Sequence, residues 1–228
     1  MKKTIIGISS MLLLLIFTGA KTVSKMDVNI YTYLALGDSY TIGESVSAKE
    51  NFPNQTAQML INAGHDFHEP EIIAKTGWTT DELQEAINNH KFLPFYDFVT
   101  LLIGVNNQYR GRRVENYKPE FESLLKQAIQ FASGKTDHVI VLSIPDWGAT
   151  PFAEGRNRNQ ISMEIDAYNT SNKMIAEKYK VHYIDITPGT REASADETLL
   201  AEDKLHPSGK EYKRWADKVS TVISSILH

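Results

Sequence analysis

The chain has 228 residues, a formal net charge of −4, seven histidines and no cysteine. The absence of cysteine excludes disulfides, thiol catalysis, cysteine-based metal sites and a lipid-modified cysteine. A mildly acidic protein is also a poor candidate for nonspecific nucleic-acid binding, so no nucleic-acid partner is predicted.

The N-terminal segment has the pattern of an export signal. Lys2 and Lys3 precede an apolar run over residues 5–17, and small residues follow it up to Ala20. We predict a signal peptide over residues 1–20, cleaved near Ala20, and therefore an exported protein, periplasmic or secreted. An uncleaved N-terminal anchor is the alternative, although the run is shorter than the about 20 residues of a membrane span. After cleavage, no stable membrane insertion is expected.

The first strand predicted in the remaining chain ends at a serine. An apolar run over residues 33–36 predicts a buried strand that stops at Gly37, Asp38 and Ser39. Gly37 allows the backbone to turn there and leave Ser39 at the carboxyl end of the strand, where open α/β sheets bind ligands. A serine in this place can act as a nucleophile if a base lies beside it. Residues 41–46 are predicted to form a loop.

Helical and strand-like segments alternate after this point. Apolar spacing predicts helices over residues 52–63, 117–129 and 161–179, and capping-box patterns at Thr79–Glu82 and Ser208–Glu211 predict the starts of two more. Short apolar runs predict strands over residues 71–76, 98–103, 139–144 and 181–186. The alternation predicts one α/β domain over residues 21–228, with a mostly parallel five-stranded sheet between helices on both faces.

One histidine has the surroundings of a general base. His206 follows Asp203 by three residues and is followed by Pro207, just before the last predicted helix. Asp203 can accept a hydrogen bond from one ring nitrogen and leave the other nitrogen facing Ser39. Taken alone, the pattern also fits a surface turn that caps a helix.

An ester-cleaving serine also needs hydrogen-bond donors for the oxyanion. Gly77, at the end of the second predicted strand, can turn its N–H toward a ligand, and Asn106, after the third, carries a side-chain amide. The backbone N–H of Ser39 is the third candidate. Taken singly, Gly77 also fits an ordinary turn, and Asn106 fits a loop residue that bonds its own backbone.

Together these segments resemble the SGNH hydrolases, also called the GDSL esterase/lipase family. The four blocks that identify this family appear in order as Gly37-Asp38-Ser39-Tyr40, Gly77, Gly104-Val105-Asn106-Asn107 and Asp203-Lys204-Leu205-His206-Pro207. The resemblance spans nearly all of the chain after the signal, and its first and last blocks are the specific ones. It implies a flavodoxin-like three-layer α/β/α sandwich.

The resemblance also implies roles for single residues. Ser39 is expected to be the nucleophile, His206 the base and Asp203 its orienting acid, with Ser39, Gly77 and Asn106 forming the oxyanion hole. No cofactor is implied. Asn107 departs from the family, which has aspartate there, and the departure puts in question the hydrogen bonds that hold Asn106.

Other residues near the predicted site have two interpretations each. Trp147, after the fourth predicted strand, either lines the substrate pocket or packs in the core. Arg110 either lies at the pocket rim, where it can bind an anionic part of a substrate, or belongs to a solvated loop. No metal site is predicted, because His65, His68 and Glu69 fit a solvated turn better than a ligand set.

We therefore predict an exported serine esterase that hydrolyses a small carboxylic ester. The ester carries a short acyl or acetyl group, and a carbohydrate is one candidate for its alcohol part. The alternatives are a thioesterase or lysophospholipase acting on longer acyl chains, an acyltransferase, and an inactive carbohydrate- or ligand-binding protein. The predicted partner is a small-molecule ester, and no oligomeric state is predicted.

Overall fold

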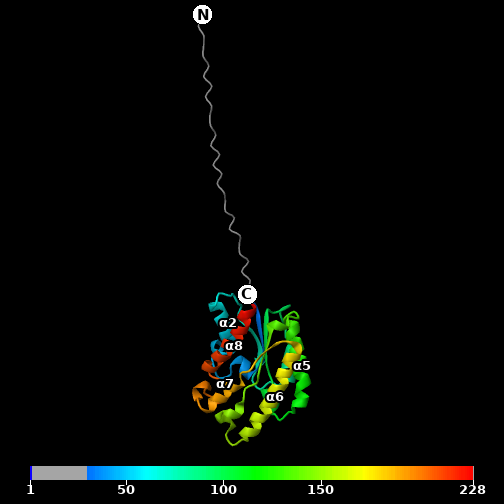
Figure 1. Ribbon diagram of the computed structural model, residues 1–228, viewed down its shortest axis with the longest axis vertical. Coiled ribbons are helices and arrows are strands. Elements are labelled where there is room, and N and C mark those ends of the chain that lie inside the picture. The colour runs from blue at the N-terminus through cyan, green and yellow to red at the C-terminus, as the bar shows by residue number, and fades with distance from the viewer. Residues whose placement is uncertain (2–29, 228) are drawn as a thin grey trace.

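The computed structural model of the protein describes residue 1 and residues 30–227 (Figure 1). The predicted signal peptide, apart from residue 1, lies outside these described residues. None of the described helices is both long enough and apolar enough to cross a membrane.

Five parallel strands form one sheet in the order β2-β1-β3-β4-β5. The strands are β1 (Tyr33–Asp38), β2 (Glu71–Lys75), β3 (Phe98–Leu102), β4 (Val139–Leu142) and β5 (His182–Ile184). All residues of the three inner strands are buried, as expected for continuous apolar runs covered on both faces.

The α-helices of the described chain follow and connect these strands. They are α1 (Ser39–Ile42), α2 (Phe52–Asn62), α3 (Thr80–Asn89), α4 (Val105–Tyr109), α5 (Val114–Phe131), α6 (Arg158–Tyr179), α7 (Thr187–Arg191) and α8 (Gly209–Ile226). Short 3₁₀ helices, among them η3 (Trp147–Ala149) and η4 (Pro151–Ala153), lie in the connections.

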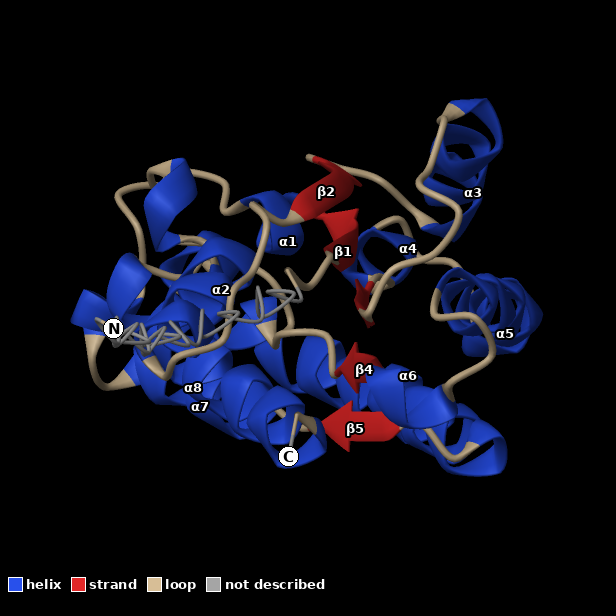
Figure 2. Cartoon of the chain, turned by 90° about the horizontal axis from the view of Figure 1, so that it is seen from above, coloured by secondary structure: helices blue, strands red, loops and turns tan. Residues whose placement is uncertain are grey.

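The helices form two layers, one on each face of the sheet. Figure 2 shows α2, α7 and α8 on one side of the strands and α3, α5 and α6 on the other, and the packing of α2 on α8 and of α5 on both α3 and α6 agrees with this arrangement. The predicted α/β fold with a parallel five-stranded sheet between helices is confirmed.

Several predicted loop and strand ends differ from the structure; the strand predicted over residues 181–186, for example, spans His182–Ile184. Residues 39–42 form a helical turn rather than entering a loop at residue 41, because Asp38 caps the Tyr40 N–H at 3.0 Å and Gly43 ends the turn with φ +77°. The strand predicted over residues 139–144 ends at Leu142. The amide of Asn169 bonds both the N–H and the carbonyl of Ile144, at 2.8 and 3.0 Å, in place of a strand partner.

One of the two predicted capping boxes is present. At α3 the Thr79 N–H and hydroxyl both donate to the Glu82 carboxylate. The box predicted at the start of α8 is wrong, because the Ser208 hydroxyl donates to the Thr198 carbonyl instead. The Glu211 carboxylate accepts from the Trp215 indole and pairs with Arg214.

Candidate active site

Ser39 lies where the order of the strands reverses. β2 pairs with one side of β1, and the chain then crosses to form β3 on the other side. The connections leave the carboxyl ends of β1 and β3 in opposite directions, and the crevice between them is where open α/β sheets bind ligands. Ser39 follows β1 and Asn106 follows β3, so both lie at this crevice.

Three side chains from opposite ends of the chain meet in one line of hydrogen bonds. Nε2 of His206 lies 2.9 Å from Oγ of Ser39, and Nδ1 of the same ring lies 2.6 Å from Oδ2 of Asp203. The Tyr40 ring packs beside the imidazole, with centroids 4.8 Å apart. A nucleophile, a base and an acid that orients the base require this geometry.

The Asp203 carboxylate also folds the loop that carries His206. Its Oδ1 accepts from the N–H groups of Leu205 and His206 at 3.0 and 2.9 Å, and Lys204, which lies between Asp203 and Leu205, adopts φ +58°. Its Oδ2 accepts from the Ser45 hydroxyl at 2.7 Å as well as from the ring. Because one side chain makes all of these bonds, the loop conformation and the ring orientation are fixed together.

Opposing effects set the pKa of Asp203. Burial would raise the pKa, but hydrogen bonds from the His206 ring, from two backbone N–H groups and from Ser45 outweigh burial and lower it to about 2. The ionised carboxylate only accepts hydrogen bonds, so a neutral His206 must carry its proton on Nδ1. The Nε2 lone pair then faces the Ser39 hydroxyl.

Gly77 occupies a tight turn at the end of β2. The Trp78 N–H donates to the Lys75 carbonyl at 3.2 Å, and Gly77 adopts φ +85°, which favours glycine at the third position of a type II turn. Gly77 lines the same cleft as Ser39. Within the described chain, the Gly77 N–H has no hydrogen-bond partner, so it is free to donate into the cleft.

The Asn106 amide is held from two sides. Its Nδ2 donates to the Trp78 carbonyl at 3.0 Å and lies 3.5 Å from Oδ2 of Asp38, a long hydrogen bond. Burial raises the pKa of Asp38 to about 7, and hydrogen bonds from Tyr40 N–H and Asn106 oppose that rise. The bond to Trp78 holds one of the two Nδ2 protons, and the other proton has only the long bond to Asp38, so it is the one that can turn to a ligand. Asn106 lines the cleft.

Asn107, the residue that departs from the family pattern, is fully buried and bonded. Its Oδ1 accepts from the Thr80 N–H at 3.1 Å and its Nδ2 donates to the Thr80 hydroxyl at 2.7 Å. The Thr80 hydroxyl donates in turn to Glu120. These bonds fasten α4, which carries Asn106, to the first turn of α3.

A cleft of about 160 Å³ opens over these groups. It is lined by Ser39, Tyr40, Thr76, Gly77, Val105, Asn106, Tyr109, Trp147, Phe152, Leu205 and His206. Both interpretations of Trp147 therefore hold in part: the residue is only 5% exposed, and it forms part of the cleft wall.

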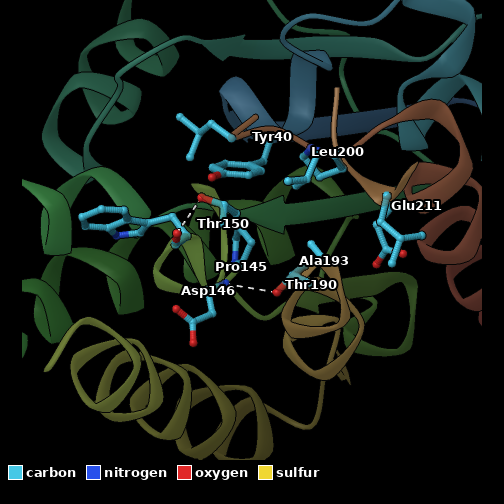
Figure 3. A pocket seen from close by; sticks show the side chains of 12 residues that line it. Tyr40, Pro145, Asp146, Thr150, Thr190, Ala193, Leu200 and Glu211 are labelled. Atoms are coloured by element: carbon cyan, nitrogen blue, oxygen red, sulfur yellow. Dashed lines mark hydrogen bonds between the residues drawn. The ribbon is translucent and has the colours of Figure 1, made fainter. Parts of the chain in front are cut away.

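A smaller cavity of about 10 Å³ shares Tyr40, Trp147 and Leu205 with the cleft. Figure 3 shows side chains from several segments around it, including Pro145 after β4, Thr190 of α7 and Ala193 just beyond α7. This volume is about that of one water probe, so the cavity is too small for a substrate.

Arg110 lies beside the turn of Gly77 rather than in the lining of the cleft. Its guanidinium donates to the Gly77 carbonyl at 2.7 Å and pairs with Glu82 at 3.2 Å. In this structure the Arg110 guanidinium is thus bound by two groups of the protein itself. Among the described residues, no group of three or more histidine, aspartate or glutamate side chains is placed to hold a metal ion.

Several residues of the site were not found from the sequence. Ser45 bonds Asp203, and the Gln108 side chain accepts from the Trp147 indole at 2.7 Å. Neither residue type carries a sequence signal for such a role. For Tyr109 the sequence does carry a signal, because Tyr109 follows Asn106 by three residues and so lies on the same face of the helix.

The chain matches the model of the GDSL-like lipase/acylhydrolase family over residues 35–214. Among solved structures it is similar to the acetylxylan esterase Axe2 from Geobacillus stearothermophilus, with a TM-score of 0.67 and 19% identity over 87% of this chain and 96% of that one. It is also similar to a lipase/acylhydrolase from Enterococcus faecalis, with a TM-score of 0.67 and 17% identity over 86% of this chain and 96% of that one.

A third similar structure is the psychrotrophic esterase EstA from Pseudoalteromonas sp., solved as a complex inhibited by monoethylphosphonate. Its TM-score is 0.62 and its identity 18%, over 86% of this chain and 98% of that one. At these identities the likeness establishes the fold. No curated protein matches the chain in sequence.

Proposed function

The chain belongs to the GDSL-like lipase/acylhydrolase family and is a carboxylic ester hydrolase, and on this basis we propose that it cleaves short-chain esters with Ser39, His206 and Asp203. The observation that carries the proposal is the line of hydrogen bonds through the imidazole, 2.9 Å to the Ser39 hydroxyl and 2.6 Å to the Asp203 carboxylate.

In the first half of the reaction, Ser39 Oγ attacks the ester carbonyl while His206 Nε2 takes the hydroxyl proton. The carbonyl oxygen becomes an oxyanion, and the N–H groups of Ser39 and Gly77 and the amide of Asn106 donate to it. Each such donor contributes about 3 kcal/mol in related chemistry. His206 then gives its proton to the leaving alcohol, and the acyl group stays on Ser39.

In the second half, a water molecule attacks the acyl-enzyme. His206 takes a proton from the water, and a second tetrahedral intermediate forms in the same oxyanion hole. On its collapse the bond between the acyl carbon and Ser39 Oγ breaks, His206 returns the proton to Oγ, and the acid is released. Asp203 stays ionised throughout, which agrees with its lowered pKa.

The size of the cleft supports a short acyl group. The volume of the cleft, about 160 Å³, is close to that of an engineered protein cavity of about 150 Å³ that binds benzene. A long acyl chain would therefore extend into solvent. A similar structure bears the name of an acetylxylan esterase, and an acetylated carbohydrate is therefore the second candidate substrate.

We further propose that the protein is exported and that its signal peptide, residues 1–20, is cleaved. N-terminal sequencing of the exported chain tests this proposal.

The test compares the purified chain with its Ser39→Ala variant on p-nitrophenyl esters and with a fluorophosphonate probe. The parent should hydrolyse the esters and take up the probe on Ser39, and the variant should lose both, with a fall in kcat on the order of 10⁴–10⁶-fold. Ser225→Ala is the matched control, because Ser225 is exposed in the last turns of α8, the end of the helix away from His206. Equal rates for Ser39→Ala and the parent would refute the mechanism.

A further inference from the structure

Three aromatic rings form one continuous wall of the cleft. Tyr109 and Phe152 each meet the Trp147 indole edge-on, with centroids 5.2 and 6.1 Å away, and lie 6.3 Å from each other. We refer to Tyr109, Trp147 and Phe152 as the aromatic shelf. Tyr109 and Phe152 remain 46% and 45% exposed, so the shelf offers exposed apolar surface to a ligand.

The shelf is held in a fixed position relative to the reacting groups. The Trp147 indole N–H donates to Gln108 on α4, and the Gln108 amide donates to Glu164 on α6, each at 2.7 Å. α4 also carries Asn106 and Tyr109, three residues apart and therefore on the same helix face. The apolar surface thus begins one helical turn from the oxyanion donor.

The lining of the cleft favours a hydrocarbon over a hydroxylated ligand. Apart from the site residues themselves and two tyrosine hydroxyls, the polar side chain in the lining is Thr76, whose hydroxyl already donates to Glu44. The guanidinium of Arg156 lies over the Tyr109 ring, 5.9 Å from its centroid, and so shields part of that ring. Sugar hydroxyls would find few partners here, whereas methylene groups lose nothing by leaving water.

From these contacts we propose that the aromatic shelf binds the acyl chain of the ester and sets its preferred length at four to six carbons. The proposal rests on the ester hydrolysis proposed above and adds its substrate class. The size follows from the volume: about 160 Å³ is close to that of a cavity that holds the six carbons of benzene. Longer chains would leave their ends in water and gain no further binding.

The test is a series of p-nitrophenyl esters with two, four, six and ten acyl carbons. Each methylene that the shelf buries fully should raise kcat/KM by about fourfold, so hexanoate should exceed acetate by about tenfold or more even with partial burial. Decanoate should give no further rise. Phe152→Ala and Tyr109→Ala should each lower the hexanoate-to-acetate ratio by about fivefold, and Phe152→Leu should restore most of it because it replaces the lost apolar area.

The matched control is Phe95→Ala. Phe95 is 54% exposed and precedes β3, so it lies at the opposite end of the sheet from the cleft. Its removal should leave the ratio unchanged. A second series varies the alcohol instead, from ethyl to hexyl acetate. The shelf variants should not change how kcat/KM depends on the length of the alcohol.

The outcomes separate the two proposals. If Ser39 takes up the fluorophosphonate probe and esters are hydrolysed, but Phe152→Ala leaves the hexanoate-to-acetate ratio unchanged, only the acyl-binding role is wrong. A shelf effect confined to the alcohol series, or a preference for acetylated sugars over butanoate, also overturns it. If Ser39 is unlabelled and no ester is cleaved, the proposed function fails together with this inference.

Discussion

Replacing Asp203 by asparagine should inactivate the enzyme while leaving the loop folded. Asp203 Oδ1 accepts from two backbone N–H groups, so the amide oxygen of an asparagine would take that place and keep both bonds. The amide nitrogen would then stand at the position of Oδ2, 2.6 Å from Nδ1 of His206. A donor would thus face the ring nitrogen that now carries the proton.

The magnitude follows from the tautomer. With a donor beside Nδ1, the neutral imidazole must hold its proton on Nε2, where it points at the Ser39 hydroxyl and cannot accept the proton of that group. The same exchange of aspartate for asparagine in a serine protease triad lowers kcat by about 10⁴-fold, equivalent to about 5.5 kcal/mol. We expect Asp203→Asn to lower kcat on p-nitrophenyl butanoate by about 10³–10⁴-fold.

Two measurements make the test specific. kcat of Asp203→Asn and of the parent is compared from pH 5 to 9, and thermal melts check that the variant is folded. Ser45→Ala serves as a milder comparison, because it removes one of the bonds to Oδ2 but leaves the carboxylate in place. If folded Asp203→Asn keeps more than a tenth of the parent kcat, the carboxylate does not set the tautomer and the argument is wrong.

Four further results are expected at the same site. Asn106→Ala should lower kcat by about 10²–10³-fold with little change in KM, because one oxyanion donor is lost. Gly77→Ala should lower the free energy of unfolding, measured in urea, by about 1–2 kcal/mol, since φ +85° disfavours a side chain even though the nearest atom lies 3.9 Å away. Asn107→Ala should lower the melting temperature by about 4–8 °C, because it leaves the buried N–H and hydroxyl of Thr80 without their partner. The pKa of Asp203 is lowered from 3.8 to about 2 in the folded protein, so its ionised form stabilises the fold above pH 4. The difference in the free energy of unfolding between the parent and Asp203→Asn should therefore be constant above about pH 5 and shrink as the pH falls toward 2.

The fold was predictable because its central strands are unambiguous. The runs at β1, β3 and β4 are apolar at nearly every position, which only a strand buried on both faces requires, and helical periodicity follows each of them. The ends of the strands were less predictable. The end of β4 depends on the Asn169 amide, which arrives from α6 and has no signal next to residue 142.

The position of the candidate site was predictable for a related reason. In a parallel sheet the carboxyl ends of all strands lie at one edge, so Ser39, Gly77 and Asn106 must gather there once their strands are identified. The approach of His206, 167 residues after Ser39, could be expected from its neighbours Asp203 and Pro207, but the spacing along the chain does not predict it. That separation is bridged by the packing of α8, which begins just after His206, against α2.

The role of Asn107 shows what sequence patterns leave out. An aspartate in its place could accept from the Thr80 N–H as the asparagine does, but it could not donate to the Thr80 hydroxyl, which would have to turn toward the new carboxylate. Glu120 would then lose the hydrogen bond that this hydroxyl now donates. The asparagine therefore fits this chain because it frees the hydroxyl for Glu120, and the departure from the family pattern is explained by a residue on α5 rather than by the chemistry of the site.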